Sequence, residues 1–160
     1  MDQRPDVHLE TLRSAVAAES SDGRCVAQNP YDNAVCTIKF NVTTRCIDIV
    51  WKMYATSLQL RFVHECLLDL IRMHHAVAIL GDDTALGIIH ADDQAWIAGN
   101  WLPRAIAAGL AAGASKAPAT YFAEQSVRRI QASAPSGIRL RSFRELGEAR
   151  AWLAACCSRS

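Results

Sequence analysis

Two pairs of aspartates, Asp82-Asp83 and Asp92-Asp93, flank a histidine, His90. Carboxylate oxygens and water are the ligands that Mg²⁺ prefers, so the chemistry open to this segment is hard-cation binding. The alternative is that Asp92 and Asp93 stabilise the positive end of a helix, by about 0.3 to 1 kcal/mol each, while Asp82 and Asp83 are solvated loop residues. We favour the second interpretation and therefore predict no metal and no cofactor.

Two tryptophans, Trp96 and Trp101, follow in the same segment. Large aromatic side chains often dominate the free energy of protein interfaces. Their spacing departs from the four-residue repeat of one helix face, so we expect one indole in the core and the other partly exposed. An exposed Trp101 would anchor a partner or a second copy of the chain. The two tryptophans, the four aspartates and His90 together form the candidate interaction surface.

No complete catalytic motif is present in the sequence. His64-Glu65 begins like the helical motif of zinc proteases, but the residue four positions after His64 is Leu68, where that motif requires a second histidine. The sequence also contains neither a glycine-flanked nucleophile elbow nor a glycine-rich phosphate loop. We therefore expect a protein that is not an enzyme.

The elements that would position these residues alternate between strands and helices. Apolar and β-branched residues dominate 34–40 and 46–54, which predicts an antiparallel hairpin. Thr56 and Gln59 have the spacing of a capping box, so a helix should begin there. The apolar run 76–80 then predicts a buried strand that ends in the loop containing the first aspartate pair.

Pro103 lies within the helical pattern that follows His90. Because proline lacks an N–H and crowds the preceding turn, we expect a kink near Gly99-Asn100, or two shorter helices. After this helix, residues 116–122 predict a strand that Pro118 weakens. The remaining expected elements are a helix over 124–134, an edge strand over 138–143 and a final helix over 144–155.

Composition excludes several classes of partner. The chain has 160 residues, with 17 Lys+Arg against 16 Asp+Glu and a net charge of +1, so no overall field attracts it to nucleic acid or to an anionic membrane. No apolar stretch approaches the roughly 18 residues of a membrane span. The N-terminus lacks the features of an export signal, so we expect a cytoplasmic protein whose six cysteines remain thiols.

The order of these elements predicts an α/β fold in which helices cover a mixed sheet. We expect a domain over residues 24–156, preceded by an N-terminal appendage over 1–23 and followed by a tail over 157–160. The appendage is expected to be helical or disordered.

A family resemblance rests on this element order and on three segments, DDQAWIAGNWLPRAIAAGL, SVRRI and FRELGEARAWL. They resemble the bacterial STAS-like family related to anti-sigma-factor antagonists, over residues 29–154. The resemblance implies a mixed sheet of about four to five strands covered by helices. It also implies a non-catalytic regulatory domain that binds another protein or itself, for example as a homodimer.

The sequence departs from this family at one functional position. In partner-switching members a serine at the start of the helix after the central strand is phosphorylated, whereas the matching residues here are His90-Ala91-Asp92-Asp93. The resemblance therefore predicts no phosphorylation switch at that position. The alternative function is a carrier or sensor of a small apolar, lipid-like ligand in a cavity between helix and sheet, which the bend at Pro103 would open.

Overall fold

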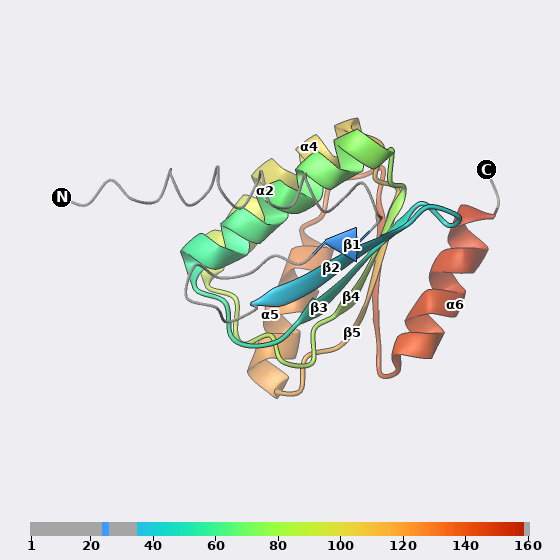
Figure 1. Ribbon diagram of the computed structural model, residues 1–160. Helices are drawn as coiled ribbons and strands as arrows, with labels where there is room; N and C mark the ends of the chain where they lie inside the picture. The colour runs from blue at the N-terminus through green and yellow to red at the C-terminus, as the bar shows by residue number, and fades with distance from the viewer. Residues whose placement is uncertain (1–23, 26–34, 159–160) are drawn as a thin grey trace.

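The computed structural model of the protein describes residues 24–25 and 35–158 (Figure 1). The expected appendage, residues 1–23, and the last residues of the expected tail, 159–160, lie outside the described residues. The described residues form a mixed β-sheet with helices packed on it, which confirms the predicted α/β fold class.

The strands of the sheet are ordered β1-β2-β3-β4-β5-β6, as they are in the sequence. Strands β1, β2 and β3 pair antiparallel, and β3 to β6 pair parallel. Five strands of five or six residues agree with the expected number, and the two-residue β1 extends the sheet beyond β2. The bounds are β1 Arg24–Cys25, β2 Cys36–Asn41, β3 Cys46–Trp51, β4 Ala78–Asp82, β5 Ala112–Lys116 and β6 Arg139–Phe143.

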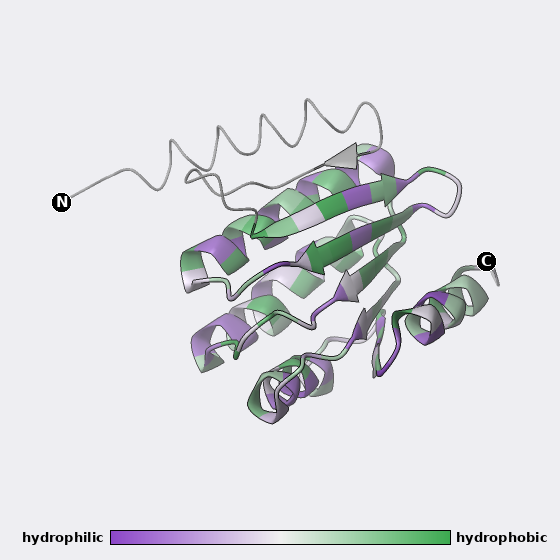
Figure 2. Ribbon diagram, turned by 60° about the horizontal axis from the view of Figure 1, so that its bottom comes forward, coloured by the Kyte–Doolittle hydropathy of each residue, from purple (hydrophilic) through white to green (hydrophobic). Residues whose placement is uncertain are grey.

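Helices cover both faces of the sheet, but unequally (Figure 2). The parallel strands follow one another in a single direction, and because crossovers are right-handed, the helices that connect them lie on one face. The last helix packs on β4, β5 and β6 from the other face. The helices are α2 Ser57–His74, α3 Ala91–Trp96, the π-helical turn η2 Ile97–Trp101, α4 Leu102–Ala107, α5 Tyr121–Ala132 and α6 Leu146–Cys157.

The predicted hairpin and the start of α2 are confirmed. Cys36 pairs with Trp51 and Asn41 with Cys46 across the hairpin. Thr56 Oγ1 accepts a hydrogen bond from the N–H of Gln59, whose side-chain oxygen accepts one from the N–H of Thr56. This reciprocal cap satisfies backbone donors that the first turn of a helix leaves without partners.

The predicted kink before Pro103 is a π-helical turn that joins α3 to α4. The N–H of Leu102 bonds to the carbonyl of Ile97, one residue further back than in an α-helix. Pro103 has no N–H to offer the carbonyl of Gly99, so the regular bond ladder is interrupted here in any case. Inserting a π-turn keeps the helix continuous through this interruption.

The strand predicted over residues 116–122 is wrong. The strand is β5, Ala112–Lys116, and α5 already begins at Tyr121. The residues of β5, AGASK, have low intrinsic β-propensity. For this reason the sequence pattern placed the strand over the aromatic residues that follow. The small side chains fit because β5 is a central strand between α6 and the connecting helices, where large side chains would not have room.

The edge strand and the final helix are confirmed as β6 and α6. Ala149 and Leu153 of α6 are buried against the small side chains of Ala78, Ala112 and Ala114. These alanines allow the helix axis to approach the sheet closely. None of the helices in the described part of the chain combines the length and hydropathy needed to cross a lipid bilayer.

Candidate functional site

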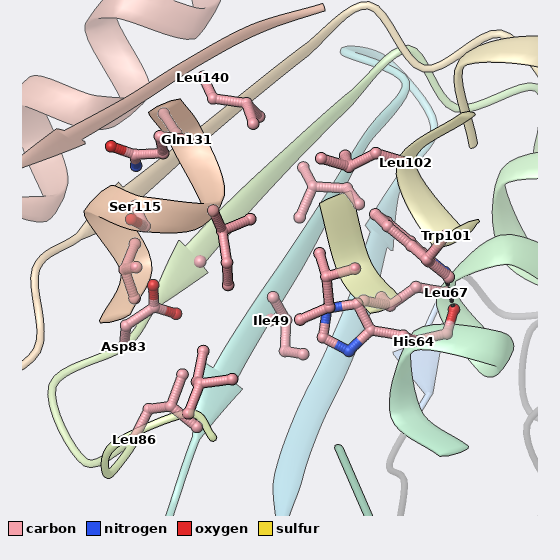
Figure 3. Close-up of a pocket in the computed structure, with 18 of the residues that line it drawn as sticks. Ile49, His64, Leu67, Asp83, Leu86, Trp101, Leu102, Ser115, Gln131 and Leu140 are labelled. Atoms are coloured by element: carbon pink, nitrogen blue, oxygen red, sulfur yellow. Dashed lines mark hydrogen bonds between the residues drawn. The ribbon is translucent and has the colours of Figure 1, made fainter. Parts of the chain in front are cut away.

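A pocket of about 160 Å³ lies between the sheet and the connecting helices; we call it the helix-sheet pocket (Figure 3). Most of its wall is aliphatic or aromatic. Its lining residues are Ile49, Trp51, Leu60, His64, Leu67, Ile79, Gly81, Asp83, Leu86, Ile89, Ile97, Trp101, Leu102, Leu110, Gly113, Ala114, Ser115, Val127, Ile130, Gln131, Leu140 and Arg141. Among these only Arg141 is exposed, so the pocket meets solvent near β6.

Small residues in the sheet create the hollow. The register aligns Ile49 of β3 with Gly81 of β4, Ser115 of β5 and Ser142 of β6 in one row across the sheet. Side chains in such a row face the same side. Because Gly81 and the two serines are small, they leave space beneath helices that the larger side chains of neighbouring rows hold away from the sheet.

The π-helical turn supplies part of the opposite wall. Ile97, Trp101 and Leu102 line the pocket from η2 and the start of α4. Trp101 is fixed by its indole N–H, which donates to the carbonyl oxygen of His64, and by an edge-to-face contact of 4.9 Å between the two ring centroids. The interruption caused by Pro103 therefore positions residues of the site.

One end of the helix-sheet pocket is polar. Asp83, Ser115 and Gln131 lie on the same side in Figure 3, away from Trp101. The Ser115 and Ser142 hydroxyl oxygens are 3.3 Å apart, and Gln131 Nε2 donates to Ser142 Oγ at 2.7 Å. Burial raises the pKa of Asp83 to about 7, with a contribution from the negative charge of Asp82, against the opposing effect of a hydrogen bond from Ser115.

A second polar group, away from Asp83, is His64. Its Nδ1 lies 2.8 Å from the carbonyl oxygen of Leu60, and since a carbonyl can only accept, Nδ1 carries the proton. Burial lowers the pKa of His64 to about 4, although the Leu60 carbonyl and the acidic residues Glu65 and Asp93 favour the charged form. The imidazole is consequently neutral at physiological pH, and its Nε2 has a lone pair that can accept a hydrogen bond.

These two shifts determine the charges of the Asp83 and His64 side chains. Between about pH 4 and about pH 7, His64 is neutral and Asp83 is protonated, so neither side chain carries a charge. Above about pH 7, Asp83 is a carboxylate in mainly apolar surroundings. The arrangement is suited to binding a small molecule by apolar contact and one or two hydrogen bonds.

The loop between β4 and α3 closes the end of the pocket near Asp83. Leu86 and Ile89 of this loop line the pocket. The N–H of Ile89 donates to Ser126 Oγ of α5 at 3.1 Å, and the side chain of Gln94 donates to the carbonyl of Ile89 at 2.7 Å. Because Ser126 is fully buried, its hydrogen bond to Ile89, which joins the loop to α5, is shielded from competition with water.

Three residues of the candidate interaction surface are buried. Trp101 is only 4% exposed, and Asp83 and Asp93 are buried. Asp93 Oδ1 accepts hydrogen bonds from Ser57 Oγ and Arg61 Nε, both at 2.7 Å. Their place in the candidate interaction surface is therefore wrong, because sequence spacing alone did not reveal the partners of Asp93 in α2 or the packing of Trp101 on His64. The expectation of one core indole and one partly exposed indole agrees with the buried Trp101 and the half-buried Trp96.

The other members of that surface remain accessible. His90 and Asp92 are exposed, and His90 Nε2 lies 3.3 Å from the hydroxyl of Tyr54. Asp82 accepts hydrogen bonds from the N–H and the hydroxyl of Thr84. Trp96 is half-buried, with the guanidinium groups of Arg61 and Arg104 at 5.1 and 5.9 Å from its ring centroid. Within residues 35–158, no three acidic, histidine or cysteine side chains gather as metal ligands would.

Sequence reasoning missed the polar residues of the pocket wall, His64, Ser115 and Gln131. A usable signal was present in the strands. Gly81 and Asp83, like Gly113 and Ser115, are two residues apart and so share one face of their strand. Small residues on the same face of adjacent parallel strands indicate a hollow beneath the covering helices.

Comparison with protein-family models finds no match for the chain, and comparison with curated proteins finds no significant relative.

Proposed function

We propose that the protein binds a small, mainly apolar molecule in the helix-sheet pocket, as a carrier or a sensor. The observation that supports this function is the pocket itself, with a mainly apolar wall and a few polar groups, among them Asp83 and His64. Ligand sites of proteins typically combine these two features.

The size of the pocket limits the ligand. Cavities of about 150 Å³ with aliphatic and aromatic walls admit benzene. At about 160 Å³ the pocket suits a molecule the size of one ring or a short branched chain.

The proposal can be tested by thermal unfolding in the presence of benzene, toluene, indene and indole. At least one of these should raise the melting temperature of the wild-type protein, because a ligand that binds only the native state stabilises it. Val127→Phe adds volume to the wall of the pocket and should abolish the response. Val42→Phe is the matched control, since Val42 is 73% exposed in the turn of the hairpin.

Two results would contradict the proposal. One is a wild-type melting temperature that none of the four compounds changes. The other is an equal response of the Val127→Phe variant, since that would place binding outside the pocket. Native mass spectrometry of the purified protein adds a direct measurement, because a carrier retains the mass of its ligand when desolvated gently.

A second candidate function is protein binding at the edge of the sheet where the parallel strands end. Large apolar side chains are exposed in the segments that follow β3, β4 and β5, and we call them the carboxyl-edge surface. Exposed apolar residues that contact one another often mark interaction sites, and the rings of Tyr121 and Phe122 do so, with centroids 5.5 Å apart. The carboxylates of Asp82 and Asp92 come from the same edge and favour a partner with basic residues around an apolar centre. The surface comprises Met53, Tyr54, Leu58, Ile88, Tyr121 and Phe122.

This second function agrees with the resemblance to anti-sigma-factor antagonists, which bind proteins. The variant Tyr121→Ser/Phe122→Ser should fold normally, because both side chains are more than 60% exposed. A partner captured by the wild-type protein, lost by this variant and released at high ionic strength would support the proposal. Sedimentation of the isolated protein separates a second copy from a different partner. Identical capture by both proteins would contradict a role of this surface.

A further inference from the structure

We propose that the helix-sheet pocket selects a neutral, ring-sized ligand that presents an N–H or O–H group to the carboxyl of Asp83. This inference rests on the proposed function and specifies the chemical class of the ligand. It follows from an imbalance between donors and acceptors in the pocket wall.

The side-chain donors around Asp83 and His64 already have partners within the protein. The indole N–H of Trp101 donates to the carbonyl of His64. Gln131 Nε2 donates to Ser142 Oγ, and the hydroxyl of Ser115 lies between Ser142 Oγ and the carboxyl of Asp83. His64 Nδ1–H is bonded to Leu60. A ligand that offers only acceptors would therefore find few donors beside Asp83 and His64. The other donor-bearing side chains of the described lining are Trp51 and the exposed Arg141.

Acceptors remain at both ends of the pocket. Asp83 has two carboxyl oxygens, and in either protonation state at least one of them can accept a hydrogen bond from a ligand. At the other end, the neutral imidazole of His64 keeps the lone pair of Nε2, which no hydrogen bond among residues 35–158 engages. A donor on the ligand thus gains a partner at either position.

The apolar wall excludes a cation as the preferred donor. An ammonium group loses most of its hydration on burial, and a single carboxylate offsets this loss only with additional hydrogen bonds. The lining already includes one cationic side chain, that of Arg141, whose guanidinium lies 5.1 Å from the centroid of the Phe143 ring. A neutral N–H or O–H on a ring is desolvated at far lower cost.

The test compares indole with indene, which has the same shape but lacks the N–H. Calorimetric titration at about pH 8, where Asp83 is ionised, should show indole binding at least tenfold more tightly, because hydrogen bonds to charged groups are the stronger ones. Asp83→Leu removes the acceptor and should reduce the ratio to within about threefold. Asp83→Asn retains a carbonyl oxygen, so it should keep part of the preference. Asp82→Asn is the matched control, since Asp82 bonds to Thr84 outside the pocket.

The outcomes separate this inference from the proposed function. Equal affinities of indole and indene for the wild-type protein would overturn the donor preference and leave ligand binding intact. A preference for indole that survives Asp83→Leu would also overturn it, because Asp83 would not be the acceptor. If neither compound binds the wild-type protein, the proposed function fails together with the inference.

Discussion

Gly81 lies two residues before Asp83, and a Cβ atom at position 81 would lie 3.1 Å from Asp83 Oδ1. The same atom would lie 3.6 Å from Ser115 Cβ and 3.7 Å from Ile49 Cγ2. Only the first of these distances is shorter than ordinary van der Waals contact. Because Gly81 has no side chain, the carboxyl of Asp83 has room to lie close to the backbone of β4.

Gly81→Ala should displace the Asp83 carboxyl from Ser115. We expect the free energy of unfolding to fall by about 1 kcal/mol, since overpacking a buried site forces small shifts. Urea denaturation measures this change. Gly99→Ala is the matched control, because a Cβ there meets no atom within 4 Å, and removing a glycine from a helix is neutral or stabilising by up to roughly 1 kcal/mol. Equal stabilities of the two variants would contradict the close approach.

Asp92 and Asp93 occupy the same helix turn and should respond differently to substitution. Asp93 is 2% exposed and bonded to Ser57 and Arg61, whereas Asp92 is exposed. Asp93→Ala leaves two donors without their acceptor and should cost about 1 to 3 kcal/mol. Asp92→Ala should cost at most about 1 kcal/mol of helix-dipole stabilisation. Chemical denaturation of both variants under identical conditions distinguishes the two roles, and equal losses would refute them.

The sequence predicted the dipole role for both aspartates. It could not predict that Asp93 alone would bind side chains of α2. Helix N-termini attract acids in general, so the pair itself carries no information about which carboxylate has a partner. The partners of Asp93 come from α2, more than 30 residues earlier in the chain. Contacts between residues so far apart depend on the packing of α2 beside α3, which no local pattern specifies.

Elements with strong periodicity or explicit capping were predictable from the sequence. The Thr56-Gln59 box fixes the start of α2, and Pro103 fixes the irregular turn before α4. Strand β5 was misplaced because alanine, glycine and serine have little β-propensity of their own. The same small residues form the floor of the helix-sheet pocket, so the feature that obscured the strand also creates the site.

The pH dependence of stability should reveal opposite effects of Asp83 and His64. The pKa of Asp83 is raised from 3.8 to about 7, so its contribution to stability is fully present below pH 3.8 and is lost as the pH rises to about 7. The pKa of His64 is lowered from 6.5 to about 4, so its contribution is present above pH 6.5 and is lost as the pH falls to about 4. In the wild-type protein the two trends oppose each other between about pH 4 and pH 6.5.

Single variants separate these trends. The free energy of unfolding of Asp83→Asn, relative to wild type, should increase from about pH 4 to about pH 7, because only the wild type loses stability there through Asp83. For His64→Phe, the same difference should decrease from about pH 4 to pH 6.5. Urea denaturation across this range provides the measurement. Difference curves that stay flat would show that the two groups titrate alike in the native and unfolded protein.

Trp101 lies in the core and Trp96 lies at its edge, so their substitution should have different effects on stability. Trp101 is 4% exposed and donates its indole N–H to His64, so Trp101→Ala should destabilise the protein by about 3 to 5 kcal/mol. Trp96 is half-buried beneath the guanidinium groups of Arg61 and Arg104, and Trp96→Ala should cost much less, on the order of 1 kcal/mol. Thermal unfolding measures both losses. Trp101 could serve as a core residue or as an interface residue, and sedimentation of the folded Trp101→Ala variant decides between these roles. Loss of self-association without loss of stability would make Trp101 an interface residue and contradict its place in the core.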